Sequence, residues 1–245
     1  MDITLTPDNI VYWQAGFIKL NATILFTWLV MGILILGSWL ITRKLSPTAE
    51  ISHWQSLLES LVLTIRDQIQ DISRQNPDPY LPFVGTLFLF ISLSNFLNIL
   101  PGYHAPTASL SATAALAICT FFAVPFYGIN KRGLIGYLRN YIEPTPVMLP
   151  FQIISELSRT LALAVRLFGN VMSGSLIVAI LLSIVPLLVP VLIEALELLI
   201  GQLQAYIFAV LAMVFIASAT RAQDEENQDN DQENNSSKKT TNPGG

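Results

Sequence analysis

Charged side chains inside long apolar stretches are the residues of this sequence with the chemistry to move an ion. Two apolar stretches near the C-terminal end keep five charges: Glu156, Arg159, Arg166, Glu194 and Glu197. An arginine at the centre of a membrane costs about 2.5–3.5 kcal/mol on insertion scales, so it needs a compensating role. A guanidinium keeps its proton in a protein, whereas a glutamate can titrate. The set therefore indicates a fixed positive charge beside groups that bind and release a cation.

Arg166 is the most informative of these charges. It lies about sixteen residues into its apolar stretch and has no acidic residue within four positions. Its counter-ion must therefore come from another helix or from another protein. Glu194 and Glu197 suit ion relay because they can titrate, although either could instead form a structural pair with an arginine.

The polar residues of both stretches fall on narrow helical faces. At about 100° per residue, one stripe holds Ser155, Arg159, Ala162, Arg166, Asn170 and Ser173. On the next stretch one face holds Glu197, Gly201, Gln204 and Phe208, with Glu194 at its edge. Two polar stripes on facing helices predict a hydrated path or a seam that binds a partner.

Simpler interpretations stay open for the secondary candidates of this set. Glu156 could end a helix paired with Arg159 at i+3. Arg159 could also extend its head group to the membrane interface. Ser173 and Ser175 could be small packing residues rather than part of an ion path.

The composition excludes most soluble classes of protein. The 245 residues are 52% hydrophobic and 12% charged, with a mean hydropathy of +0.54, whereas soluble domains carry about 25% charge. The net charge of −4 comes from an acidic tail, and no basic cluster is dense enough to suggest nucleic-acid binding. The single Cys119 excludes an internal disulfide. We find no HExxH, GxSxG or phosphate-binding Gly-rich motif, so we expect no cofactor and no metal site.

The predicted fold class is an all-α integral membrane protein with about five transmembrane helices. The predicted spans cover residues 22–42, 81–100, 108–127, 150–185 and 187–219. The last two exceed one perpendicular crossing, so we expect long, tilted helices or parts that lie on the surface. Residues 50–75 predict an amphipathic helix, either at the membrane interface or packed on the protein itself. The membrane domain would be residues 1–220, followed by a disordered acidic tail at 221–245.

The loop charges predict the orientation of the chain. With five spans, one side of the membrane receives Arg43, Lys44, Arg66, Arg74, Lys131, Arg132, Arg139 and Arg221. Only Lys19 falls on the other side. The positive-inside rule then places the N-terminus outside and the C-terminus in the cytoplasm.

Four motifs resemble subunit a of F-type ATP synthases in its bacterial and chloroplast form. The segment SRTLALAVRLFGNVMSG (158–174) is similar to the signature of that family, and LQAYIF (203–208) to its second hallmark. PTPVMLP (144–150) and KRG (131–133) also look like these members. The likeness covers roughly residues 10–220.

The resemblance implies roles for the central residues. Arg166 would be the essential arginine that faces the carboxylate of a rotating c-ring, and Gln204 would orient it. Asn170 matches the asparagine one turn after that arginine. The implied partners are the c-ring, the peripheral-stalk b-type subunits, the rest of the ATP synthase and the lipid bilayer.

The resemblance also implies an ion path. The two titratable positions of the family fall on Ser175 and Glu197, and a serine cannot relay a proton as a carboxylate does. Glu197 would therefore carry that role, with Glu194. Asn95 and Asn98 match polar positions near the path. Before the third span, where the family has an acidic or Asn-rich motif, this chain has Thr107, Ser109 and Ser111.

The implied function couples translocation of protons, or of sodium ions, to rotation and to ATP synthesis or hydrolysis. The chain itself would be non-catalytic and would lie in a bacterial plasma membrane or a thylakoid membrane. One alternative is an ion channel or secondary transporter that works alone, but we see no internal repeat. Another is a membrane-embedded hydrolase, against which the missing catalytic motifs argue.

Overall fold

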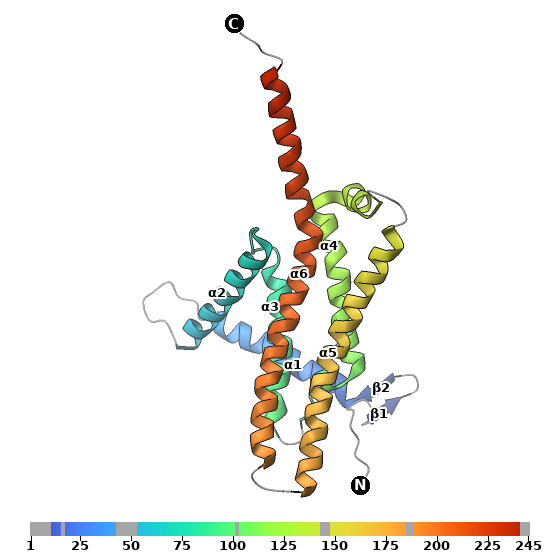
Figure 1. The fold of residues 1–245 in the computed structure, drawn as a ribbon. Helices are drawn as coiled ribbons and strands as arrows, with labels where there is room; N and C mark the ends of the chain where they lie inside the picture. The colour runs from blue at the N-terminus through green and yellow to red at the C-terminus, as the bar shows by residue number, and fades with distance from the viewer. Residues whose placement is uncertain are drawn as a thin grey trace.

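The computed structural model describes residues 11–15, 18–42, 53–100, 103–142, 148–184 and 189–240 (Figure 1). In chain order the elements are β1 (Val11–Ala15), β2 (Ile18–Asn21), α1 (Ala22–Thr42), α2 (His53–Ser73), α3 (Leu81–Phe96), η2 (Leu97–Ile99), η3 (Pro106–Ala108), α4 (Leu110–Ile142), α5 (Met148–Ile184) and α6 (Val189–Thr240). In this part of the chain, five helices are long and apolar enough to cross a membrane: α1, α3, α4, α5 and α6. The predicted all-α membrane class is thereby confirmed. The antiparallel β1–β2 hairpin precedes α1 and was not expected.

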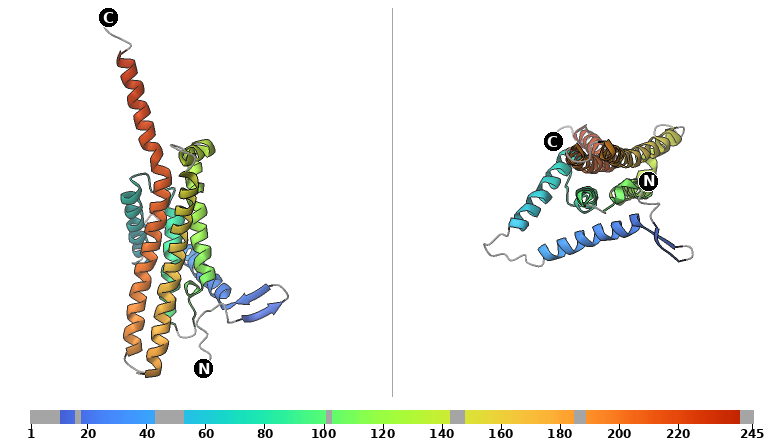
Figure 2. Two further views of the ribbon diagram at one scale, coloured as in Figure 1. Left: turned by 45° about the vertical axis from the view of Figure 1, so that its right-hand side comes forward. Right: turned by 90° about the horizontal axis from the view of Figure 1, so that it is seen from below.

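The helices form layers. Seen from below, α5 and α6 lie side by side along one edge, α3 and α4 form a second row, and α1 lies beyond them (Figure 2). Helix α6 packs against α2, α3, α4 and α5. Helix α1 is attached to the α3–α4 connection, where the rings of Phe26 and Tyr103 meet edge to face at 4.8 Å between centroids. The pair α5–α6 therefore has one face on the bundle and one face open.

Small side chains let α6 approach its neighbours closely. Ala205, Ala209 and Ala212 are buried in two apolar clusters with residues of α2, α3, α4 and α5. Alanines at a helix interface allow close contact between backbones, which is how helices associate in lipid. Large side chains such as Leu203 and Ile207 point away from the bundle and are exposed. The outer surface of α6 is thus suited to lipid or to another apolar protein surface.

Helix α4 continues past its predicted end. We expected a basic loop after residue 130, but the structure is helical to Ile142, with a break at Gly133. Gly133 has φ 73° and ψ 162°, a conformation that glycine adopts without steric cost. The prediction of a loop was wrong because the glycine interrupts the helix at one residue and does not end it.

Helix α2 presents an apolar face to the protein and a charged face to the outside. Ile69 is buried against α3 and α6, with Ile65 and Ile72 beside it. Glu59 and Asp67 are exposed. This agrees with the amphipathic pattern, and the position of α2 at a membrane surface stays a prediction.

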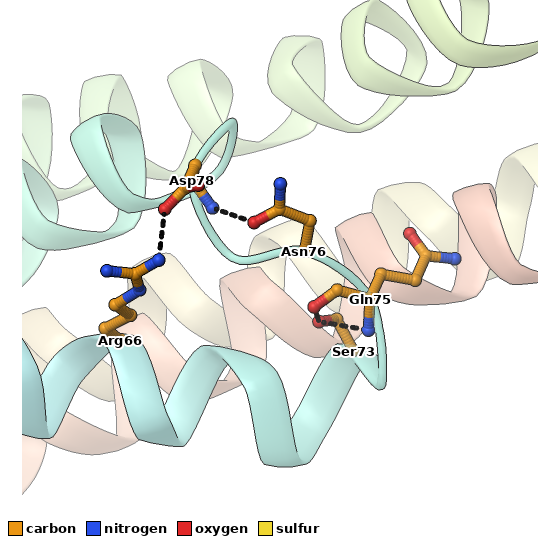
Figure 3. A network of polar contacts seen from close by, with 5 residues as sticks. All are labelled: Arg66, Ser73, Gln75, Asn76 and Asp78. Atoms are coloured by element: carbon orange, nitrogen blue, oxygen red, sulfur yellow. Dashed lines mark hydrogen bonds and ion pairs between the residues drawn. The ribbon is translucent and has the colours of Figure 1, made fainter.

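Polar contacts fix the turn between α2 and α3 (Figure 3). The guanidinium of Arg66 pairs with Asp78 at 3.0 Å. The Asp78 backbone N–H donates to Asn76 Oδ1 at 3.3 Å, and the Gln75 backbone N–H donates to Ser73 Oγ at 3.2 Å. Arg74 takes a positive φ of 51°, the left-handed conformation in which many helices end. The next helix, α3, can therefore start close by.

The last two helices are the longest, with 37 residues in α5 and 52 in α6. At about 1.5 Å per residue, each exceeds the roughly 30 Å of hydrocarbon. We predicted disorder for residues 221–245, whereas the structure continues α6 to Thr240 beyond the other elements (Figure 1). Alanine, glutamine, glutamate and lysine in this segment have good helix propensity. Its side chains lie outside the described residues, so disorder of the tail stays a prediction.

Candidate functional site

Asn170 of α5 and Gln204 of α6 meet where the two long helices pack together. Asn170 Nδ2 donates a hydrogen bond of 2.7 Å to Gln204 Oε1. Gln204 is 3% exposed, and its Nε2 has no partner among the residues that the structure describes. A buried amide nitrogen without an acceptor is costly, so a water molecule or a partner group is expected there. The contact agrees with the polar faces predicted for these helices.

Arg166 lies one turn before Asn170 on α5, and its side chain is exposed. Within the described part of the chain, it forms no hydrogen bond and no ion pair. Its neighbours Leu161 and Val165 are also exposed, whereas Leu167 is fully buried on the other side of the helix. Among the described residues, Arg166 is therefore an unpaired cation on an open face of α5 that it shares with the exposed Arg159, Asn170 and Ser173.

The carboxyl group of Glu197 is lodged against a glycine of α5. A Cβ added at Gly174 would lie 2.5 Å from both Cδ and Oε1 of Glu197. Such a distance is shorter than any ordinary contact, so a larger residue at this position would force the Glu197 carboxyl group to move. Oε1 of Glu197 is buried and has no partner among the described residues. The glycine thus lets an acidic side chain enter the interface between α5 and α6.

This acidic side chain lines a pocket of about 170 Å³ between α3, α5 and α6. Its lining consists of Asn95, Asn98, Ile99, Asn170, Val171, Ser173, Gly174, Ile177, Ile193, Glu194, Leu196, Glu197, Leu198, Ile200 and Gly201. Because one water needs roughly 10–15 Å³ of such volume, several waters fit. The two carboxyl groups and the amides offer them hydrogen-bonding partners. Arg166 and Gln204 are not part of the lining.

Helix α3 closes the pocket with an asparagine that is fully engaged. Asn95 Nδ2 donates to the carbonyl oxygen of Gly201 at 2.8 Å, and Asn95 Oδ1 accepts from Thr107 Oγ1 at 3.0 Å. Both Asn95 and Thr107 are buried. Thr107 thus contributes to the site through its hydroxyl group, at the position before the third span where the polar side chains of the sequence carry only hydroxyl groups.

Sequence analysis missed a further polar pair between the same helices. Gln202 Nε2 donates to the backbone carbonyl of Ser92 at 3.0 Å, and the Ser92 hydroxyl bonds to Gln202 Oε1. The available signal was two uncharged polar residues inside apolar spans.

The remaining candidates lie away from this centre or are satisfied locally. The Arg159 guanidinium stacks over the Phe215 ring, 5.5 Å from its centroid, and Glu156 is half-buried. The Ser173 hydroxyl donates to the Asn170 carbonyl at 3.0 Å, and that of Ser175 to carbonyls of its own helix. Glu194 is exposed at the pocket. No cluster of three or more His, Cys, Asp or Glu that could hold a metal occurs in the described ranges.

Just outside the spans, Tyr103 is a half-buried ionisable group. Burial raises the pKa of Tyr103 to about 12, and the nearby Ser94 hydroxyl opposes part of that shift. Its ring also contacts Phe26 of α1. Tyr103 therefore stays protonated at physiological pH and joins α1 to the α3–α4 connection.

Comparison with known proteins gives consistent matches. The family model described as ATP synthase A chain matches residues 24–217. ATP synthase subunit a 2 of Acaryochloris marina is 61% identical over 224 residues, which cover 91% of this chain and 96% of the relative. ATP synthase subunit a 1 of Crocosphaera subtropica is 60% identical, covering 92% and 97%. ATP synthase subunit a of Albidiferax ferrireducens is 58% identical, covering 89% and 95%.

Proposed function

The chain belongs to the ATP synthase A chain family, subunit a of F-type ATP synthases, and we propose that Arg166 and the pocket of Glu197 form its proton-translocating machinery. Subunit a is a proton-translocating component of the membrane sector of that enzyme. The chain is thus an integral membrane protein and part of an ATP synthase complex, not a channel or transporter that works alone.

The observation that carries the proposal is the unpaired, exposed guanidinium of Arg166. A charge on a lipid-level surface needs a counter-ion, and the described part of this chain supplies none. The counter-ion is then a carboxylate on a neighbouring subunit, the rotating c-ring. The guanidinium stabilises the charged form of each passing carboxylate and repels a cation that would leak directly across.

The pocket is the proposed outer half-channel. Its lining residues follow Arg166 on α5 and precede Gln204 on α6, so they lie toward the end where these helices are joined (Figure 1). With the N-terminus outside and the C-terminus in the cytoplasm, as the loop charges predict, that end faces the outside. Water in the pocket would bring a proton to Glu197, with Glu194 at the entrance.

Transfer to the rotor completes the proposed path. Glu197 gives its proton to a c-ring carboxylate, which becomes neutral and can rotate into lipid. After nearly a full turn the carboxylate releases the proton to a second half-channel on the cytoplasmic side and passes Arg166 in its charged form. Gln204, held by Asn170, orients the guanidinium without cancelling its charge. Asn98 and Ser173 add polar groups to the entrance.

In this proposal the chain does not itself catalyse the synthesis or hydrolysis of ATP. A separate catalytic part of the complex would make or hydrolyse ATP, and b-type peripheral-stalk subunits would hold this chain still against the rotor. Purification tests this assignment: a ring of small hairpin subunits should accompany the chain. A purified oligomer of this chain that conducts protons by itself would contradict it.

Arg166→Ala tests the central residue. In the reconstituted complex we expect ATP-driven proton pumping to be abolished, because the passing carboxylate loses the fixed counter-charge of Arg166. Arg66→Ala is the matched control, since it removes a guanidinium that forms an exposed ion pair at the turn between α2 and α3 and should change little. Pumping retained in Arg166→Ala would defeat the assignment of Arg166.

A further inference from the structure

Uncharged polar groups join α3 to α6 beside the pocket, and two of them, Asn95 and Gly201, are part of its lining. We call this group the polar seam: Ser92, Asn95, Thr107, Gly201 and Gln202. Ser92 and Gln202 exchange two hydrogen bonds, one of them through the Ser92 backbone carbonyl. Asn95 connects Thr107 to the Gly201 carbonyl. Three hydrogen bonds thus link the two helices, and a fourth joins Thr107 of η3 to Asn95.

The polar seam tolerates few arrangements of α6 against α3. Both polar atoms of Asn95 are engaged, and the residue is 6% exposed. An amide left unpaired in apolar surroundings is costly, so sliding or turning α6 is penalised. The helices also approach closely here, because a Cβ added at Gly201 would lie 3.1 Å from Asn95 Cβ.

The seam and the proposed proton path share the same two turns of α6, and Gly201 lines the pocket together with Glu197. At about 100° per residue, Gly201 and Gln202 are turned by about 40° and 140° from Glu197, and Gln204 by about 20° in the opposite sense. A helix is stiff over two turns. Fixing Gly201 and Gln202 against α3 therefore fixes where Glu197 and Gln204 point on the side of α5.

We propose that the polar seam sets the rotation of α6 about its own axis and so holds Glu197 against Gly174 and Gln204 against Asn170. Ser92, Asn95, Thr107 and Gln202 are positioning residues in this proposal. Asn95, which the sequence places near the ion path, holds the helix rather than passing the proton. The inference rests on the proposed role of Glu197 as a relay group.

The pH dependence of proton transport can report on the position of Glu197, because few other charged groups surround it. In the described lining of the pocket, Glu194 on the same helix is the other charged residue. Helix α3 contributes the neutral Asn95 and η2 the neutral Asn98, and α5 contributes Asn170, Ser173 and Gly174, also neutral. Turning α6 would change the contact of Glu197 with water and with these groups. The pH profile of transport would shift, whereas a loss of folded protein would lower transport equally at every pH.

Two matched pairs of variants test the seam in the complete, reconstituted complex. Ser92→Ala and Thr107→Val remove a hydroxyl, while Ser92→Thr and Thr107→Ser keep it. Ser218→Ala removes a hydroxyl of α6 that bonds only within its own helix and serves as the control. ATP-driven proton pumping is measured between about pH 5 and pH 9, together with the amount of this chain in the purified complex.

We expect Ser92→Ala and Thr107→Val to move the pH of half-maximal pumping by about half a unit or more, roughly a threefold change in proton affinity. The hydroxyl-keeping variants and Ser218→Ala should keep the original profile. An unshifted profile in both Ser92→Ala and Thr107→Val overturns the proposal. So does failure of both to assemble while their hydroxyl-keeping partners assemble, because the seam would then serve folding alone.

Glu197→Gln separates this proposal from the proposed function. If Glu197→Gln keeps the original pH profile, the relay role of Glu197 is wrong, and the seam has nothing there to position. If Glu197→Gln changes the profile or abolishes pumping while Ser92→Ala and Thr107→Val leave the profile unshifted, the seam proposal fails alone.

Discussion

Gly174→Ala should uncouple the proton path while leaving the fold nearly intact. The added methyl group would lie 2.5 Å from Cδ and Oε1 of Glu197 and 2.8 Å from its Cγ. Overpacking a protein interior costs about 1–3 kcal/mol. The clashing atoms belong to the far half of a flexible side chain, which can rotate away. The cost to folding should therefore stay near the lower value, about 1 kcal/mol.

The cost to transport should be larger, because a carboxyl group that rotates away leaves its place between α5 and α6. If this displacement raises the activation free energy of the transport step by about 1–3 kcal/mol, the rate of that step falls by roughly 5- to 150-fold. ATP-driven proton pumping by reconstituted complexes measures this rate, and the content of this chain in the complex measures folding.

Gly85→Ala is the control for that experiment. It places the same methyl group in open space on α3, and there alanine stabilises a helix by about 0.5–1 kcal/mol relative to glycine. Its pumping should match that of the unmodified protein. Wild-type pumping in Gly174→Ala, or equal losses in both variants, would refute the placement of Glu197 against Gly174.

Three further predictions concern the contacts around the site. Asn170→Leu and Gln204→Leu should each reduce pumping, with a coupling energy of about 0.6–1.7 kcal/mol in the double-mutant cycle; strict additivity would contradict the Asn170–Gln204 contact. Tyr103 has a pKa raised from 10.0 to about 12, so its contribution to stability is complete below pH 10 and is lost as the pH rises to 12. Tyr103→Phe should therefore lose less of its thermal stability over that interval than the unmodified protein, and identical losses would rule this out. Tyr206→Phe removes the exposed hydrogen bond to Gln68 of α2 and should lower the free energy of unfolding by less than about 1 kcal/mol; a larger loss in thermal unfolding would show that α2 depends on this bond more than on its buried Ile69.

Much of the fold follows from the distribution of apolar residues along the chain. A helix in lipid satisfies its backbone hydrogen bonds internally, so an apolar stretch of sufficient length predicts a spanning helix with few alternatives. The bounds of α1 illustrate this, because Ala22–Thr42 coincides with the predicted residues 22–42. The path of α4 beyond Gly133 and the β1–β2 hairpin could not be predicted in this way. They depend on single backbone conformations and short-range pairing, which hydropathy does not reveal.

The candidate site could also be predicted only in part from the sequence. The meeting of Asn170 with Gln204 follows from helical periodicity, because both residues lie on the polar faces of their helices. The engagement of Asn95 with Gly201 could not be predicted, since a hydrogen bond to a backbone carbonyl leaves no pattern in side-chain types. Ser92 and Gln202 were overlooked because an uncharged polar residue costs far less in a membrane than a charge and has many ordinary uses there.

The separation of Arg166 from the acidic residues of its own chain has a mechanistic consequence. Glu194 and Glu197 lie in the pocket, whereas Arg166 lies outside its lining and forms no ion pair within the described residues. A permanent pair with either glutamate would satisfy the guanidinium and remove its attraction for a moving carboxylate. It would also hold that glutamate ionised and unable to pass a proton on. By holding Glu197 against Gly174, α5 and α6 keep the proposed relay acid apart from the arginine, which in the proposed mechanism leaves each able to interact with the rotor in turn.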